Sequence, residues 1–192
     1  MTDAASDRTD VDRVLAGDVN AFANLLKRYQ DHVTRIVRRH VPPDRVEETA
    51  QDVFVRAYRS LGNFREDDRF RQWLSAITVR TCYDFWRRRY RRQEVVVSQL
   101  SETHRAWIEK VGAADAEQAW QALGNRAEAR QVLDWALAQL SAEDRMVIEL
   151  VHLEERSVKE AARLLGWSVA NVKVRAFRVR KKMHKLIEKR LA

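Results

Sequence analysis

The sequence predicts an all-α protein made of two small helical domains that are joined by a flexible linker. Hydrophobic residues make up 45% of the 192 residues, which is enough to build helical cores. Only 5 glycines and 2 prolines occur, and so few breakers favour long helices over a β-sandwich or a barrel. The basic residues cluster in two blocks, 1–93 and 131–192, on either side of a slightly acidic stretch at 94–130. We therefore expect one domain in each basic block, with the linker between them.

The first domain should begin with a short helix over residues 11–17, followed by a longer helix that Asp18 caps. The prolines at 42–43 cannot continue a helix and should end it. Asp44 then starts a further helix, with Glu47 three residues later as in a capping box. All these segments carry apolar residues at helical spacing, so they should pack together as a small bundle.

The last helix of the first domain should follow a short polar loop over residues 63–68. It starts near Phe70 and runs into the basic stretch 87–92, which holds five arginines around Tyr90. Like charges at this density repel one another unless an anion lies alongside. Aromatic and cationic side chains on one surface suit nucleic acid, because bases stack and phosphates pair with arginine. A charged helix end that leads into the linker is the plainer alternative.

The linker, residues 94–130, should be a connector that holds at most a short helix. Trp107 and Trp120 lie in it among polar residues. Their role is not readable from the sequence, and local packing is the simplest use.

The second domain has the pattern of a helix-turn-helix. Ser141 is placed to cap one helix, and Ser157 with Glu160 forms a capping box for the next, which is short. Gly166 is a turn glycine, and Ser168 is placed to cap a last helix of about 20 residues. Residues 168–192 hold nine basic residues and one acidic residue, which favours a DNA-reading helix.

Several classes of protein are disfavoured. The five histidines show no metal-ligand spacing with the single cysteine or with carboxylates, so neither a metal nor a cofactor is expected. No phosphate loop or nucleophile elbow occurs, and no catalytic residues or small-molecule substrate are expected. Cys82 should be a small packing residue. The chain begins with a polar, acidic segment and contains no long apolar run, so we expect a cytoplasmic protein without a secretory signal or membrane span.

Four segments in this order resemble a bacterial sigma factor of the extracytoplasmic-function (ECF) group. They are residues 17–22, residues 50–58, residues 70–77, and the set made of 140–141, 157–166 and 169–180. The resemblance covers nearly everything except the linker. It implies sigma region 2 in residues 1–93 and sigma region 4 in residues 131–192. Such a protein binds core RNA polymerase and directs it to promoters, while the polymerase performs the chemistry.

The resemblance also implies site residues in both domains. The polymerase clamp would contact Gln51, Asp52, Phe54, Val55 and Arg56. The minus-ten element, opened as a single strand, would meet Asn63, Phe64, Arg65, Trp73, Arg80, Arg87 and Arg88. The minus-thirty-five duplex would meet Ser168, Asn171, Lys173, Val174, Arg175, Phe177, Arg178 and Lys181.

Some of these assignments have plainer readings. Asp52 and Arg56 are one helical turn apart and could simply pair with each other. Phe64 could pin its loop to the bundle, and Trp73 fits a core position better than a base platform. Promoter sequence, regulon and inducing signal are not readable.

The expected partners are core RNA polymerase, promoter DNA and an anti-sigma factor, which in this group is often anchored in a membrane. The nearest rival is a helix-turn-helix regulator that acts without joining polymerase. It would not need the basic stretch 87–92 or a long linker. A helical nuclease or another enzyme is a weaker rival, because no constellation of catalytic residues supports it.

Overall fold

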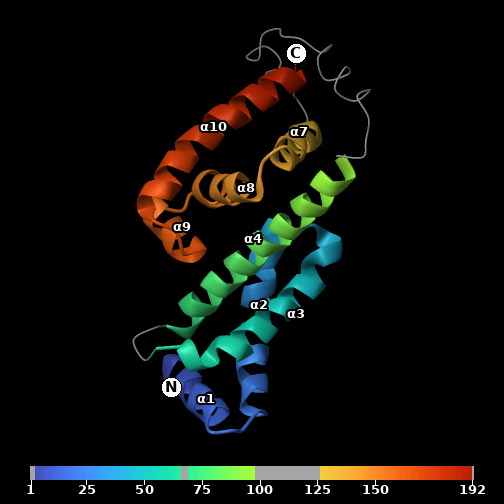
Figure 1. Cartoon of the computed structure of the whole chain (residues 1–192). Helices are drawn as coiled ribbons and strands as arrows, with labels where there is room; N and C mark the ends of the chain where they lie inside the picture. The colour runs from blue at the N-terminus through green and yellow to red at the C-terminus, as the bar shows by residue number, and fades with distance from the viewer. Residues whose placement is uncertain (1–2, 66–68, 98–125, 192) are drawn as a thin grey trace. The chain divides into compact units, whose positions relative to one another are not determined.

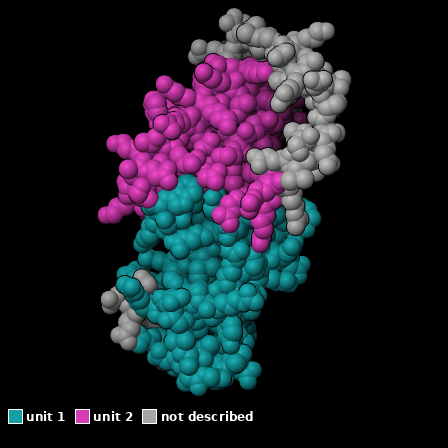
Figure 2. Space-filling model, viewed as in Figure 1, with its two compact units in different colours: residues 1–85, 162–167 teal, residues 86–161, 168–192 magenta. Residues whose placement is uncertain are grey.

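The computed structural model describes residues 3–65, 69–97 and 126–191. The elements in these ranges are all helical, and none of them is a strand, as the sequence predicts (Figure 1). Two compact units are distinguished in Figure 2. Unit 1 comprises residues 1–85 and 162–167, and unit 2 comprises residues 86–161 and 168–192.

Unit 1 begins with α1 (Asp3–Leu15) and α2 (Ala21–His40), which pack against each other. A buried polar cluster joins these two helices. The Arg28 guanidinium of α2 donates hydrogen bonds to Asp7 and Asp10 of α1, and the Tyr29 hydroxyl donates to Asp7. Burial alone would raise the pKa of Asp10, but hydrogen bonds from Asn24 and Arg28 outweigh it and lower that pKa. These contacts explain why α1 starts eight residues before the helix expected at 11–17.

The rest of unit 1 is built from a 3-10 turn (Pro43–Arg45), α3 (Val46–Ser60), a second 3-10 turn (Leu61–Asn63) and the first part of α4 (Phe70–Val97). Fully buried aliphatic side chains from α2, α3 and α4 form its core, as the apolar spacing predicts. They are Leu25, Val33, Val37, Val53, Ala57 and Leu74. The single cysteine, Cys82, is also fully buried, which confirms its packing role.

Unit 2 contains the end of α4, then α7 (Arg126–Ala138), α8 (Ala142–Ile148) and a π-helical turn (Glu149–Leu153). The helix-turn-helix follows as α9 (Val158–Leu165) and α10 (Val169–Leu191), with α9 divided between the two units. Helix α10 packs on α7 and α8. Since α4 runs to Val97 and α7 starts at Arg126, both helices extend into the segment expected to be linker. Trp107, Trp120 and the short linker helix lie outside the described residues.

The predicted helix caps are confirmed in the second domain and wrong for α2 and α3 of the first, although α4 starts at Phe70 as expected. Ser141 accepts a hydrogen bond from the backbone N–H of Asp144, as expected of an N-cap. By contrast, Asp18 does not cap α2, because its carboxylate pairs with Arg13 instead. The capping box at Asp44 is also absent: residues 43–45 form a 3-10 turn, and no side chain caps α3.

Candidate functional site

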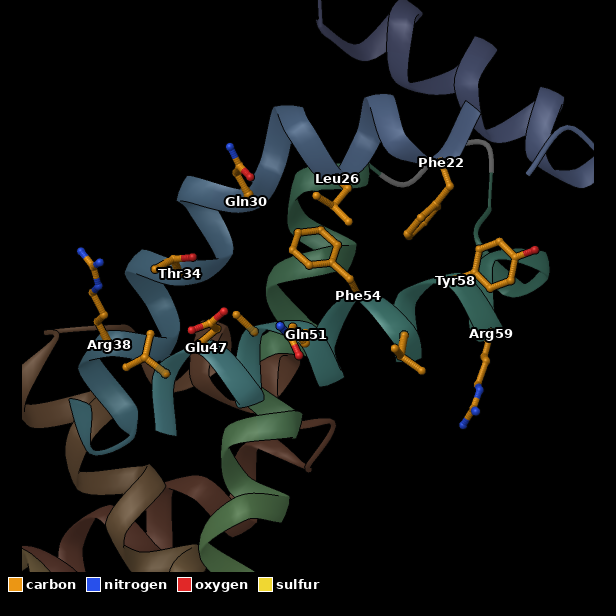
Figure 3. A pocket seen from close by; sticks show the side chains of 13 residues that line it. Phe22, Leu26, Gln30, Thr34, Arg38, Glu47, Gln51, Phe54, Tyr58 and Arg59 are labelled. Carbon is orange, nitrogen blue, oxygen red and sulfur yellow. The ribbon is translucent and has the colours of Figure 1, made fainter. Parts of the chain in front are cut away.

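A groove of about 1120 Å³ runs between α2 and α3 on unit 1 (Figure 3). Figure 3 shows Phe22 and Leu26 of α2 facing Phe54 of α3 across this space. The lining side chains are Phe22, Leu26, Gln30, Thr34, Arg38, Val46, Glu47, Ala50, Gln51, Phe54, Val55, Tyr58 and Arg59. The groove therefore contains three of the five residues predicted to bind the polymerase clamp, namely Gln51, Phe54 and Val55.

The spacing of residues along α3 explains this wall of the groove. Residues 51, 54, 55 and 58 recur at three- and four-residue intervals and lie on one face of the helix. Val53 and Ala57 lie on another face and are fully buried in the core of unit 1. Helix α3 thus has one apolar face in the core and a second, partly apolar face in the groove.

The centre of the groove is apolar and open to solvent. Leu26 is 39% exposed, Val55 is 46% exposed and Tyr58 is 41% exposed. The Phe22 and Tyr58 rings meet edge to face, with centroids 5.2 Å apart. Contiguous exposed apolar side chains on a chain with a net charge of +8 are typical of a protein-binding surface rather than a phosphate-binding one.

Asp52 and Arg56, also predicted to bind the clamp, do not line the groove. Arg56 Nη1 donates to Asp84 Oδ2 of α4 at 2.6 Å, and its Nε lies 3.4 Å from Asp52 Oδ2. Burial alone would lower the pKa of Arg56, but these carboxylates outweigh it and raise that pKa. The expected Asp52–Arg56 pair is therefore present, and it is extended by a third residue that links α3 to α4.

The loop after α3 brings two of the predicted minus-ten residues together. The half-buried Phe64 ring packs edge-on against Phe70 and Trp73, with centroids 5.6 and 5.4 Å away. Trp73 is also only half-buried. Asn63 and Arg65 on either side of Phe64 are exposed. The loop is pinned to the bundle through Phe64, while the edge of this aromatic cluster stays accessible.

The predicted phosphate-binding arginines lie along α4. Arg87 and Arg88 are exposed in its second half. Arg80 is exposed as well, and its Nε donates to the backbone carbonyl of Leu164, at 3.2 Å within unit 1. Within unit 2, Trp86 stacks on Tyr90 with centroids 5.6 Å apart, and burial raises the pKa of the Tyr90 hydroxyl.

The helix-turn-helix has the predicted caps and turn. Ser157 Oγ accepts a hydrogen bond from the Glu160 backbone N–H, and Glu160 Oε2 accepts one from the Ser157 backbone N–H. Gly166 has a φ of +73°, a left-handed conformation that glycine adopts without strain. Ser168 Oγ accepts from the Asn171 backbone N–H at the start of α10. The local chemistry that starts α9 and α10 and forms the turn between them could thus be predicted from the sequence.

Helix α10 has a buried face and an exposed basic face. Val172, Ala176, Val179 and Met183 are buried, as their spacing predicts. All but one of the predicted minus-thirty-five residues lie on exposed positions; these are Ser168, Asn171, Lys173, Val174, Phe177, Arg178 and Lys181.

Two apolar side chains interrupt the exposed basic face of α10: Val174 is 48% exposed and Phe177 is 64% exposed. Lys181 Nζ lies 4.7 Å from the centroid of the Phe177 ring. Exposed apolar side chains among cations are what contact with thymine methyls and sugars in a major groove requires.

Arg175 differs from its neighbours on α10. Its Nη1 donates to Asp144 Oδ1 of α8 at 2.9 Å, and its side chain is partly buried. This pair joins α10 to α8. Arg175 is thus placed to hold the helix, in addition to any contact with DNA.

The described part of the chain holds no group of three or more histidine, cysteine or acidic residues that could bind a metal ion. No helix in the described ranges is long and apolar enough to cross a membrane.

Comparison with known proteins identifies the family. Residues 25–92 match sigma-70 region 2, and residues 130–183 match sigma-70 region 4. The ECF RNA polymerase sigma-E factor of Escherichia coli K12 is 33% identical over 180 residues, which span 94% of this chain and 93% of that protein. The chain belongs to the ECF group of RNA polymerase sigma factors. The ECF sigma-E factor of Haemophilus influenzae is 29% identical over 192 residues and covers 98% of both chains.

Solved sigma-factor structures share the fold of this ECF factor. CnrH, in complex with the cytosolic domain of CnrY, superposes with a TM-score of 0.51 at 26% identity, covering 94% of this chain and 96% of that chain. RpoE of Bartonella quintana, in complex with the anti-sigma factor NepR, superposes with a TM-score of 0.53 at 22% identity, covering 86% of this chain and 95% of that chain. At this identity the likeness shows only that the two chains share a fold. Sigma factors are transcription initiation factors rather than enzymes.

The sequence did not indicate every residue that the structure places at this ECF factor's candidate sites. Phe22, Leu26 and Tyr58 line the groove, but helical spacing alone assigned them to the core. Asp84, the partner of Arg56, is not among the predicted site residues. The sequence feature that could have indicated it is that Asp84 is the only acidic residue between positions 70 and 91, in an arginine-rich helix.

Proposed function

We propose that this ECF sigma factor binds core RNA polymerase through the α2–α3 groove and directs it to specific promoters. The observation that carries the proposal is the open apolar centre of the groove, formed by Leu26, Val55 and Tyr58 inside the segment that matches sigma-70 region 2. Apolar side chains supply the binding energy, and the polar rim at Gln51 and Arg59 orients the partner.

The aromatic edge of Phe64 and Trp73 receives an unstacked base of the minus-ten element in this proposal. Unpairing and flipping a base costs a few kcal/mol, and stacking on an aromatic side chain returns about 1–3 kcal/mol. Arg80, Arg87 and Arg88 neutralise the phosphates of the opened strand along α4. Because the polymerase forms the phosphodiester bonds, this sigma factor needs only to bind and position DNA.

The exposed face of α10 reads the minus-thirty-five duplex in the major groove. Asn171, near the helix start, is placed for a base edge, and Arg178 for guanine or a phosphate. Val174 and Phe177 add apolar contacts. The residues nearer the C-terminus of α10 hold the DNA backbone.

An anti-sigma factor is the further partner that we propose. The similar structure CnrH was solved in complex with the cytosolic domain of CnrY, and RpoE was solved in complex with the anti-sigma factor NepR. A regulator that occupies the α2–α3 groove would exclude polymerase by direct competition. Anchoring of that regulator in a membrane would confine the inactive sigma factor to the cytoplasmic face of that membrane.

A binding assay with a groove variant tests the polymerase-binding part of this proposal. Purified chain is mixed with bacterial core RNA polymerase and analysed on a sizing column, with Leu26→Asp as the groove variant. Leu15→Asp is the control, because Leu15 is 55% exposed but lies outside the groove lining. We expect wild type and Leu15→Asp to migrate with polymerase and Leu26→Asp to remain free. Migration of all three with polymerase would place the interface elsewhere, and migration of none would favour a regulator that acts without joining polymerase.

A further inference from the structure

Asp84 occupies an unexpected position on the proposed strand-binding helix. It is the only acidic residue between positions 70 and 91 of α4, a segment that holds six arginines. Arg80 precedes it by four residues, and Arg87 and Arg88 follow it by three and four. These are the intervals at which helical side chains become neighbours, so the carboxylate lies among the three proposed phosphate ligands.

A bare carboxylate at this position would oppose DNA binding in two ways. It repels phosphate directly, and it competes with phosphate for the neighbouring guanidinium groups. A helix that holds a DNA strand along this face therefore needs the charge of Asp84 to be neutralised by a cation that does not itself bind the strand.

Arg56 of α3 meets this requirement. Its Nη1 lies 2.6 Å from Asp84 Oδ2, and the two side chains are 33% and 26% exposed, so the pair is partly shielded from water. Asp52, one turn earlier on α3, holds the same guanidinium from its Nε side at 3.4 Å. Two carboxylates from two helices thus fix the orientation of Arg56, and the guanidinium stays charged at any working pH.

We propose that Arg56 is a positioning residue that masks the charge of Asp84, so that Arg80, Arg87 and Arg88 can bind the opened promoter strand. This inference rests on the proposed function of α4 in strand binding. It assigns Arg56 to strand binding, through Asp84, rather than to direct contact with the polymerase clamp. It also makes Asp52 a support for Arg56.

The test compares Arg56→Ala, Asp84→Asn and the double variant with wild type. Arg45→Ala is the matched control, because it also breaks an arginine–carboxylate pair, Arg45 Nη1 to Glu48 Oε2 at 3.0 Å. This pair is exposed and lies at the start of α3, the helix that carries Arg56. Each full-length chain is first titrated with core polymerase to obtain its Kd. Saturated holoenzyme is then titrated with a fluorescein-labelled single strand of about 20 nucleotides of mixed sequence, with core polymerase alone as background.

We expect all variants to bind polymerase within about twofold of wild type, as is usual when an interface is untouched. Arg56→Ala should weaken strand binding by about three- to tenfold, because it removes the guanidinium that faces Asp84 and so increases the net negative charge within a Debye length of the phosphates. Asp84→Asn should bind at least as tightly as wild type. The double variant should recover wild-type affinity, because there is then no carboxylate left to mask, and Arg45→Ala should have no effect.

Two results would overturn the inference. In the first, Arg56→Ala loses polymerase affinity and the double variant does not recover strand binding, in which case Arg56 is a direct contact with the clamp. If Asp84→Asn weakened strand binding as much as Arg56→Ala, the pair would be a structural brace only. Failure of the proposed function itself would appear earlier and separately, as wild-type chain that forms no holoenzyme.

Discussion

Replacing Val55 by aspartate should detach this sigma factor from polymerase without unfolding it. Val55 lies on the groove face of α3 and is 46% exposed, so the fold does not depend on its burial. A surface substitution of this kind changes the free energy of unfolding by about 0.5 kcal/mol or less. Any large loss of binding would therefore report on the interface.

The expected loss can be worked out from the exposed fraction of Val55. Full burial of a valine side chain stabilises by about 1.5–3 kcal/mol, so covering the exposed half in the complex contributes about 0.7–1.4 kcal/mol. An aspartate at the same place forfeits this term and leaves a desolvated carboxylate without a partner, which costs roughly 1–3 kcal/mol more. The total, about 2–4 kcal/mol, raises the Kd for polymerase by about 30- to 700-fold.

The assay is a titration of fluorescently labelled chain with core polymerase, read as anisotropy, with circular dichroism as the check on helicity. Val19→Asp is the control, because Val19 is 59% exposed in the turn between α1 and α2 and does not line the groove. Val19→Asp should bind like wild type. Wild-type affinity in a natively helical Val55→Asp variant, or equal losses in both variants, would show that the groove does not bind polymerase.

Three further predictions concern DNA selectivity and stability. Arg178→Ala should lower discrimination between minus-thirty-five sequences by about 1–3 kcal/mol in competition binding, whereas Lys189→Ala should weaken all sequences equally; a uniform loss for Arg178→Ala would make it a phosphate contact. Ser157→Ala removes the cap that holds the Glu160 backbone N–H and should lower the free energy of unfolding by about 1 kcal/mol in denaturant titrations; an unchanged midpoint would contradict the cap. Burial, reinforced by two nearby arginines, lowers the pKa of His32 below 6.5, so its stabilising contribution is complete above that pH and is lost as pH falls through the lowered pKa. Unfolding free energy measured on acidification should therefore fall more steeply in wild type than in His32→Gln, and parallel curves would exclude His32 as the cause.

The second domain was predictable because short-range chemistry fixes it. Each cap at Ser141, Ser157 and Ser168 joins residues three positions apart, so the sequence displays both partners side by side. Gly166 likewise provides its turn conformation without help from the rest of the fold.

In the first domain, local sequence patterns mispredicted the start of α1 and the cap of α2. Residues 3–10 look too polar for a packed helix, yet Asp7 and Asp10 are buried in α1 because Arg28 of α2 pairs with both. Asp18 failed as a cap because Arg13 engages its carboxylate. In both places an arginine outside the local pattern decides the outcome. Arg28 comes from another helix, and Arg13 precedes the expected cap by five residues.

At the candidate sites, too, contacts within one helix were predictable and contacts between helices were not. That Gln51, Phe54 and Val55 share one face follows from helical spacing, and the structure brings them together in one groove. That Arg56 turns toward Asp84 does not follow, because the two residues are 28 positions apart and meet only when α3 packs beside α4. Long-range pairs of this kind depend on packing angles that no periodicity encodes.

Transcription from a library of random DNA fragments shows whether this chain directs polymerase to promoters. Core polymerase saturated with this chain is compared with core polymerase alone and with polymerase supplied with Val55→Asp. We expect transcripts from a restricted set of fragments that share two spaced elements, and only with the wild-type chain. Transcripts that do not depend on the chain would exclude a sigma factor, and an identical set with Val55→Asp would exclude the groove as its polymerase-binding surface.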